Sequence, residues 1–83
     1  LEAAGRKAAG ASLSDLAAMG ARPLGALLSL ALPVGTPPED ALALARGFGS
    51  KLAACACPLL GGNITRAPAL ALSTSALGAV PSG

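Results

Sequence analysis

Asp15 is the residue of this sequence whose type and setting most clearly suggest chemistry. It stands between Leu13 and Leu16 in the segment SLSDLAAMG, where an amphipathic helix would bury its apolar face. A carboxylate directed into a cleft from there would bind a hard cation such as Mg²⁺, which prefers oxygen ligands. The alternative is structural, because Ser12 and Asp15 have the spacing of a capping box and Asp15 would then accept a backbone N–H.

A second candidate is the segment GGNITR, residues 61–66. Two adjacent glycines let a backbone approach a ligand closely and direct N–H groups at phosphate oxygens. Asn63 would add a neutral oxygen ligand, and Arg66 a positive charge. The same residue types are also usual in a hairpin or crossover loop, so this segment alone leaves a binding role and a structural role open.

Three other patterns do not indicate a site. The segment GFGSK lacks the glycine and lysine spacing of a phosphate-binding loop and falls in a helical pattern. Cys55 and Cys57 have no second ligand pair, and the chain has no His, which favours buried or idle thiols over structural zinc. The segment NIT fits a glycosylation acceptor, which means little without a secretory signal.

Composition excludes several classes of protein. The 83 residues are 53% hydrophobic and 12% charged, the opposite of a disordered chain. A net charge of +2 and an aromatic content of 1% argue against nucleic-acid binding. The long uncharged runs, residues 23–38 and 67–83, are interrupted by Pro and do not resemble membrane spans. No signal peptide is recognisable, so we expect a cytoplasmic protein without a membrane partner.

Two helices are predicted, and the first of them carries Asp15. Residues 1–19 are Ala-rich, lack Pro and stop at Gly20, a favoured residue after a helix. A second helix is expected over residues 37–54, with Thr36 as its N-cap and Glu39 completing a capping box.

Three strands are predicted to accompany the helices. Residues 24–32, LGALLSLAL, indicate a buried strand between two prolines. A short strand at 58–60 leads into the loop GGNITRAP, and residues 70–80 alternate between two faces. This order predicts an α+β fold, with two helices packed on one face of a mostly antiparallel sheet. Phe48 and Leu52 are expected to face that sheet.

Taken together, these segments resemble the thiamine-monophosphate kinase family. The matching motifs are SDLAAMGARP, SLALP and the GGN-x-[ST]-R segment, and the likeness runs along essentially the whole chain. Asp15, Gly20 and Pro23 form a core shared with the aminoimidazole-ribonucleotide synthetases, selenophosphate synthetases and hydrogenase-maturation proteins. Those related families usually lack SLALP.

The resemblance implies an activity and a set of site residues. Members of the family phosphorylate thiamine monophosphate with ATP and Mg²⁺, a reaction that depends on positioning and charge neutralisation. Asp15 matches a family Asp that binds Mg²⁺, and Gly62 and Asn63 match a Gly-Asp pair that binds nucleotide and metal. Asn63 keeps an oxygen ligand but lacks the charge of that Asp. Ala45 stands where many members carry an aromatic residue next to ATP.

The resemblance also sets expectations for the whole protein. Residues 1–83 look like the central part of one ATP-binding domain, flanked in the family by an acidic N-terminal segment and a C-terminal domain. We therefore expect this chain to be inactive on its own. Family members pair through their sheets, which implies a homodimer. The alternative is a non-catalytic or different-substrate member of the same superfamily that acts as an interaction fragment.

Overall fold

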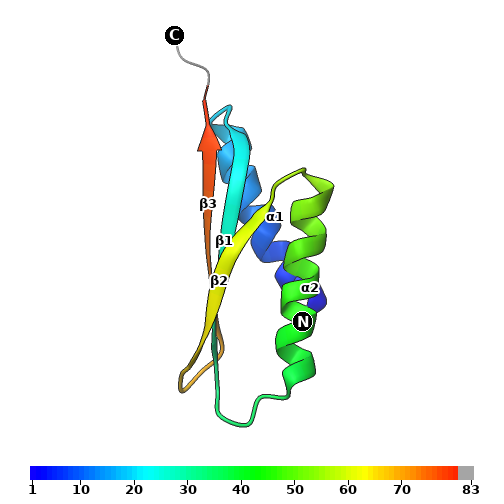
Figure 1. Cartoon of the computed structure of the whole chain (residues 1–83), viewed down its shortest axis with the longest axis vertical. Helices are drawn as coiled ribbons and strands as arrows, with labels where there is room; N and C mark the ends of the chain where they lie inside the picture. Colours follow the sequence, from blue (N-terminus) through cyan, green and yellow to red (C-terminus); the bar gives the residue numbers. More distant parts are fainter. Residues whose placement is uncertain (81–83) are drawn as a thin grey trace.

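The computed structural model describes residues 1–80 and shows two layers, a pair of helices on one face of a three-stranded sheet (Figure 1). The predicted α+β class and the one-sided layering are confirmed. No helix in the described part of the chain is long and apolar enough to cross a membrane. The elements in chain order are α1 (Glu2–Ala18), β1 (Arg22–Leu32), α2 (Pro38–Ala54), β2 (Leu59–Arg66) and β3 (Ala71–Ala79).

The sheet is mixed, whereas the sequence led us to expect mostly antiparallel pairing. β1 lies in the centre, parallel to β2 on one side and antiparallel to β3 on the other. The connections explain the difference. The chain passes from β1 to β2 through α2, and a helical crossover brings the next strand back in the same direction. The short link from β2 to β3 does not reach the opposite end of the sheet, so β3 runs the other way.

β2 is the element that differs most from its prediction. The expected loop GGNITRAP is strand as far as Arg66, paired with β1 so that Asn63 lies opposite Ser29. Gly and Asn favour turns, but the edge of β1 offers hydrogen-bond partners, and that pairing outweighs local propensity. Gly62 permits the approach, because a Cβ there would collide with the carbonyl oxygen of Leu28.

α1 ends as the sequence indicates. Gly20 has a φ of +69°, a left-handed conformation that glycine adopts without steric cost. The N–H groups of Gly20 and Ala21 donate to the carbonyl oxygens of Ala17 and Leu16, at 3.0 and 2.9 Å. This pair of bonds is the Schellman arrangement that terminates helices.

The predicted capping box of α2 is wrong. Pro37 is the N-cap and makes no side-chain capping bond. The Thr36 hydroxyl instead donates to the carbonyl oxygen of Pro33 at 2.7 Å, closing the turn before the helix. Glu39 still lies in the first turn, where its negative charge interacts favourably with the helix dipole.

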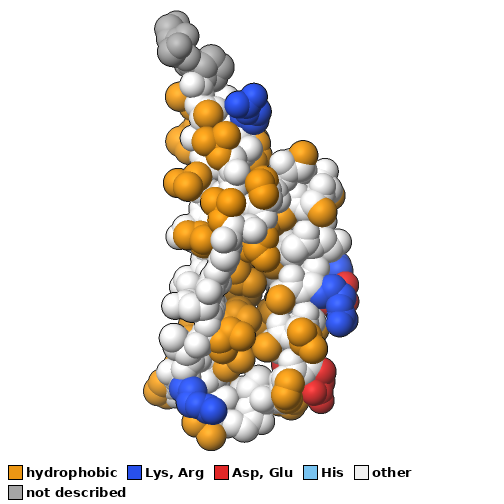
Figure 2. Space-filling model, in the orientation of Figure 1, with side chains coloured by type: hydrophobic (Ala, Val, Ile, Leu, Met, Phe, Trp, Pro, Cys, Tyr) orange, Lys and Arg blue, Asp and Glu red, His pale blue; other side chains and the backbone are white. Residues whose placement is uncertain are grey.

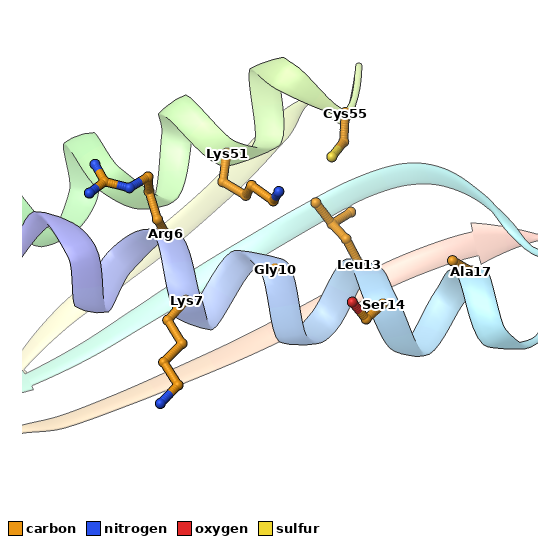
Figure 3. Close-up of a pocket in the computed structure, with 8 residues that line it drawn as sticks. All are labelled: Arg6, Lys7, Gly10, Leu13, Ser14, Ala17, Lys51 and Cys55. Atoms are coloured by element: carbon orange, nitrogen blue, oxygen red, sulfur yellow. The ribbon is translucent and has the colours of Figure 1, made fainter.

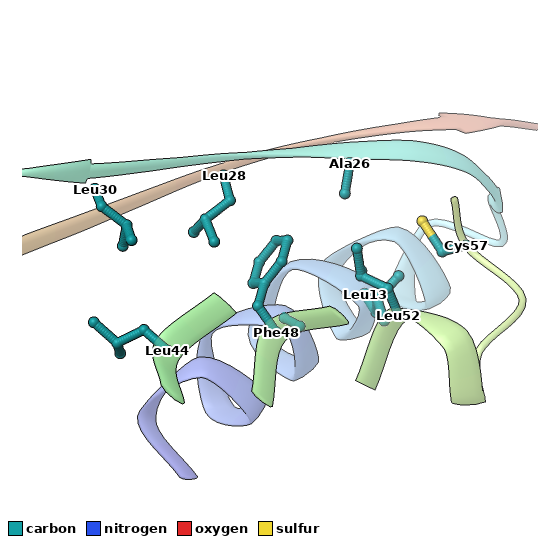
Figure 4. Packing of buried hydrophobic residues seen from close by; sticks show 9 residues of the cluster. Leu13, Ala26, Leu28, Leu30, Leu44, Phe48, Leu52 and Cys57 are labelled. Carbon is teal, nitrogen blue, oxygen red and sulfur yellow. The ribbon is translucent and has the colours of Figure 1, made fainter. Parts of the chain in front are cut away.

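The core lies between β1 and the two helices, as Figure 4 shows. Phe48 is fully buried, and its ring lies between α2 and the inward side chains of β1. The prediction that Phe48 and Leu52 face the sheet is confirmed. The buried cluster comprises Ala9, Leu13, Ala26, Leu28, Leu30, Leu44, Phe48, Leu52 and Cys57.

Candidate functional site

Asp15 lies on the exposed side of α1. Leu13 and Leu16 are buried, and a helix turns about 100° per residue, so Asp15 points away from both. α1 begins at Glu2, which places Asp15 deep inside the helix and makes the capping-box alternative with Ser12 wrong. Its carboxylate has no hydrogen bond or ion pair within residues 1–80 and is free to bind a ligand.

Gly62 and Asn63 line a shallow hollow between β2 and α2, with a volume of about 320 Å³. Ala45 of α2 lines the same hollow, so the structure brings it close to Gly62 and Asn63, which lie far from it in the sequence. Figure 2 shows hydrophobic side chains gathered between the sheet and α2. The hollow therefore has apolar walls, with the Asn63 amide as a polar group in its lining. Its lining residues are Leu28, Leu30, Ala45, Leu59, Gly61, Gly62, Asn63 and Ile64.

The described residues do not bring Asp15 to that hollow. α1 contacts β3, where the Ser12 and Thr74 hydroxyls are hydrogen bonded at 2.6 Å. The hollow borders β2, and β2 and β3 are opposite edges of the sheet. Asp15 and Asn63 therefore belong to separate surfaces of this chain.

Mg²⁺ is the metal that the resemblance implies. Residues 1–80 contain no group of three or more His, Cys, Asp or Glu that could hold a metal ion. Mg²⁺ in phosphate-transfer sites is usually bound by one or two carboxylates together with substrate phosphates and water. The exposed, unpaired carboxylate of Asp15 fits that donor set as one ligand.

A larger groove, of about 630 Å³, runs between α1 and α2 (Figure 3). Arg6 on its wall is ion-paired with Glu2 at 3.5 Å, and the Lys7 ammonium points away from α2. Lys51 of α2 and Cys55, the residue that follows α2, point into it. The groove therefore does not focus positive charge on one point, as an anion site would require.

Sequence reasoning missed the bond between Ser12 and Thr74. A signal was present, because Thr74 follows Leu72 at strand spacing and so shares the inward face of the last strand. A hydroxyl on an inward face needs a hydrogen-bond partner. Only the tertiary structure shows that Ser12 supplies it.

Comparison with known proteins agrees with this architecture. The family described as AIR synthase related protein, N-terminal domain, matches residues 1–80. The chain belongs to that family. As an AIR synthase related domain, it is expected to keep the family arrangement of helices against one sheet face, which is what the structure shows.

Two curated relatives of this AIR synthase related domain are thiamine-monophosphate kinases. The protein of Corynebacterium glutamicum is 40% identical over 77 residues, and that of Synechococcus elongatus is 45% identical over 76 residues. These matches cover 93% and 92% of the chain but 23% of each relative. The chain thus spans about a quarter of the length of these enzymes.

Solved structures show the same likeness. Thiamine monophosphate kinase from Aquifex aeolicus matches with a TM-score of 0.91 and 30% identity, over 95% of this chain and 27% of that one. The structure described as AaThiL complexed with AMPPCP and TMP matches with a TM-score of 0.88 and 31% identity, over 93% of this chain and 25% of that one. HypE of E. coli, a hydrogenase maturation protein, shares the fold at 23% identity, with a TM-score of 0.84 over 94% of this chain and 26% of that one.

Proposed function

We propose that this domain is part of a kinase that transfers a phosphoryl group from ATP to thiamine monophosphate. The observation that carries the proposal is the likeness to thiamine-monophosphate kinases in both sequence and structure, at 30–45% identity. One of these structures holds AMPPCP and TMP. We therefore propose ATP and thiamine monophosphate as the substrates of the protein to which this domain belongs.

Asp15 is the residue that we assign to Mg²⁺. Phosphoryl transfer needs the charge of the phosphates neutralised and the reacting groups held in place, and a bound Mg²⁺ supplies both. Asp15 is suited to this role because its carboxylate is exposed and has no partner within the described residues.

Gly62 and Asn63 are assigned to the nucleotide, with Asn63 offering its amide oxygen to a nucleotide-bound metal ion. Within one copy this ion is distinct from the one assigned to Asp15, because the two residues lie on separate surfaces. The hollow that they share with Ala45 supports this assignment, since a small side chain at position 45 leaves its apolar wall open. Because Asn63 carries no charge, we expect it to contribute less to Mg²⁺ affinity than an Asp would. This domain supplies part of the site, and we expect residues 1–83 alone to be inactive.

The test is Asp15→Asn in the full-length protein. Turnover of ATP with thiamine monophosphate should fall by at least about 100-fold, because the carboxylate that would hold the charge-neutralising Mg²⁺ is lost. The melting temperature should change little, since Asp15 is exposed and the substitution preserves volume. Coupled ADP release and thermal unfolding measure the two quantities.

Glu39→Gln is the matched control, because it removes an exposed negative charge from the first turn of α2. It should leave turnover within about twofold of the parent, as expected for a surface charge remote from the reaction. The assignment fails if Asp15→Asn keeps full turnover and only lowers the melting temperature.

A second candidate is a superfamily member with another substrate or without catalysis. Asn63, in the position of the family Asp, is the observation that favours it. The likeness to HypE shows that this fold alone does not choose between substrates. ATP turnover without stimulation by thiamine monophosphate would favour this candidate over the kinase.

We also propose that two copies of the protein associate through the uncovered face of the sheet. Both helices lie on the other face (Figure 1). Leu27 and Leu77 are 41% and 59% exposed, and both flank Gly25 on the uncovered face. Leu60 lies over Gly25 and is 57% exposed, so three leucines form one apolar patch. Apolar patches of this kind mark association surfaces.

A further inference from the structure

The Ser12–Thr74 hydrogen bond is the direct polar link between α1 and the sheet. The two hydroxyl oxygens are 2.6 Å apart, a short distance for an O–H···O bond, and both side chains are half-buried. Either hydroxyl can donate to the other. Within residues 1–80 it is the one hydrogen bond between two side chains, beside the Glu2–Arg6 ion pair of α1.

The other contacts between α1 and β3 are apolar. Leu16 packs onto Gly78, where an added Cβ would lie 2.9 Å from the leucine methyl group. Ala8 and Ala76 also lie at the edge of the core. Apolar attraction is non-directional, so these contacts hold the helix against the sheet but define its position along the strand less sharply than a hydrogen bond would. A hydrogen bond is directional and does define that position.

Asp15 lies three residues after Ser12 on the same helix. At 1.5 Å rise per residue, the two are separated by about 4.5 Å along the helix axis. Any shift or rotation of α1 over β3 therefore moves the Asp15 carboxylate by a similar amount. Mg²⁺ demands near-ideal octahedral geometry, so its affinity falls when a ligand such as the Asp15 carboxylate is displaced.

We propose that Ser12 and Thr74 are positioning residues, which fix α1 on β3 and thereby place the Asp15 carboxylate for the metal. This inference rests on the proposed function, because it takes Asp15 as a Mg²⁺ ligand. Neither hydroxyl touches substrate or metal in this role. Groups hydrogen-bonded directly to a metal ligand typically change metal affinity by about 10- to 100-fold when they are removed. Ser12 and Thr74 act on Asp15 only through the helix, so we expect an effect at the lower end of that range.

The experiment compares variants of the full-length protein in Mn²⁺ titrations followed by electron paramagnetic resonance, with Mn²⁺ as the probe in place of Mg²⁺. Thr74→Val replaces the hydroxyl with a methyl group of similar size and should weaken Mn²⁺ binding by about tenfold. Thr74→Ser retains the hydroxyl and should restore affinity to within about twofold, which lost packing alone would not predict. The Mg²⁺ concentration for half-maximal turnover should rise in Thr74→Val and stay close to that of the parent in Thr74→Ser.

Ser50→Ala is the matched control, since Ser50 is exposed on α2, lies outside the assigned sites and makes no side-chain hydrogen bond within the described residues. It should leave Mn²⁺ affinity unchanged. Ser12→Ala removes the same bond from the helix side with a strong helix former. Mn²⁺ affinity should fall about tenfold in Ser12→Ala too. This variant provides an independent measurement if Thr74→Val does not fold.

The Mn²⁺ affinity of Asp15→Asn, measured in parallel, tests the metal assignment of Asp15 separately from the positioning role of Ser12 and Thr74. The positioning role alone is wrong if Asp15→Asn weakens Mn²⁺ binding while Thr74→Val and Ser12→Ala merely lower the melting temperature. Both the role and the metal assignment are wrong if Asp15→Asn leaves Mn²⁺ affinity unchanged.

Discussion

Cys55 and Cys57 differ sharply in environment although one residue separates them. Cys55 is exposed, whereas Cys57 is 4% exposed and belongs to the buried cluster. Ala56 between them has a φ of +53°, and the Cys57 N–H donates to the Leu52 carbonyl oxygen at 2.9 Å, which turns the chain inward after α2. Burial raises the pKa of the Cys57 thiol, and the nearby Cys55 adds to the rise.

Iodoacetamide at pH 8 should therefore alkylate Cys55 at least about tenfold faster than Cys57 in the folded protein. The thiolate is the reactive form, and a raised pKa leaves less of it at a given pH while burial blocks access. Cys55→Ser and Cys57→Ser variants isolate each thiol, and mass spectrometry follows the label. Both should react at similar rates in denaturant, and equal rates in the folded state would contradict the burial of Cys57.

The raised pKa of Cys57 also links stability to pH. The folded-state pKa lies above the pKa of the same thiol in the unfolded chain, so the folded chain holds this proton more tightly. The resulting contribution to the free energy of unfolding is fully present below the pKa of the unfolded chain's thiol. It is lost as the pH rises through the folded-state pKa.

At the scale of elements, α1 and α2 cross with their backbones in contact. A Cβ on Gly5 would collide with the Leu44 carbonyl oxygen, and one on Gly47 with that of Glu2. Both glycines are buried. By sequence Gly47 is only a weak helix former, but in the structure it is the residue that allows the two helices to approach.

Gly47→Ala should destabilise the protein by about 1–3 kcal/mol, because overpacking exceeds the gain in helix propensity. Gly49→Ala is the matched control in the same helix, since nothing lies within 4 Å of a Cβ there. It should stabilise by about 0.5–1 kcal/mol through propensity alone. Chemical denaturation measures both, and a stabilising Gly47→Ala would show that the helices are farther apart than described.

At the scale of the whole molecule, the uncovered sheet face is the surface through which we propose that two copies associate. A two-layer fold leaves one side of its sheet in water unless another chain or segment covers it. Leu27, Leu60 and Leu77 form the apolar patch on that side. Their exposure in a single copy is the reason to expect association.

A full-length protein carrying both Leu27→Ser and Leu77→Ser should shift from dimer toward monomer in light scattering. The substitutions remove apolar surface whose burial drives association. Leu42→Ser is the matched control, because Leu42 is 59% exposed, as Leu77 is, but lies on α2 on the other side of the sheet. It should leave the mass unchanged. A parent protein that is monomeric at high concentration would refute the proposed dimer.

The sequence by itself determined the elements whose signals are local. The Ala-rich run ending at Gly20 predicted α1, because helix propensity and a left-handed C-terminal stop act within one or two turns. The apolar run before Pro33 predicted β1, and the spacing of Phe48 and Leu52 predicted the inward face of α2. The motifs around Asp15 and Asn63 carried the family resemblance in the same local way.

Only the tertiary structure decided the features that depend on partners distant in the chain. GGNITR is a strand because it pairs with the edge of β1. The Thr74 hydroxyl has a hydrogen-bond partner because Ser12 lies beside it, and position 47 needs glycine because the backbone of α1 lies against it. Asp15 and the hollow at Asn63 are likewise separated by the order of the strands. Pairing and packing energies between segments outweigh the small propensities of single residues, and those energies are defined only once the segments are brought together.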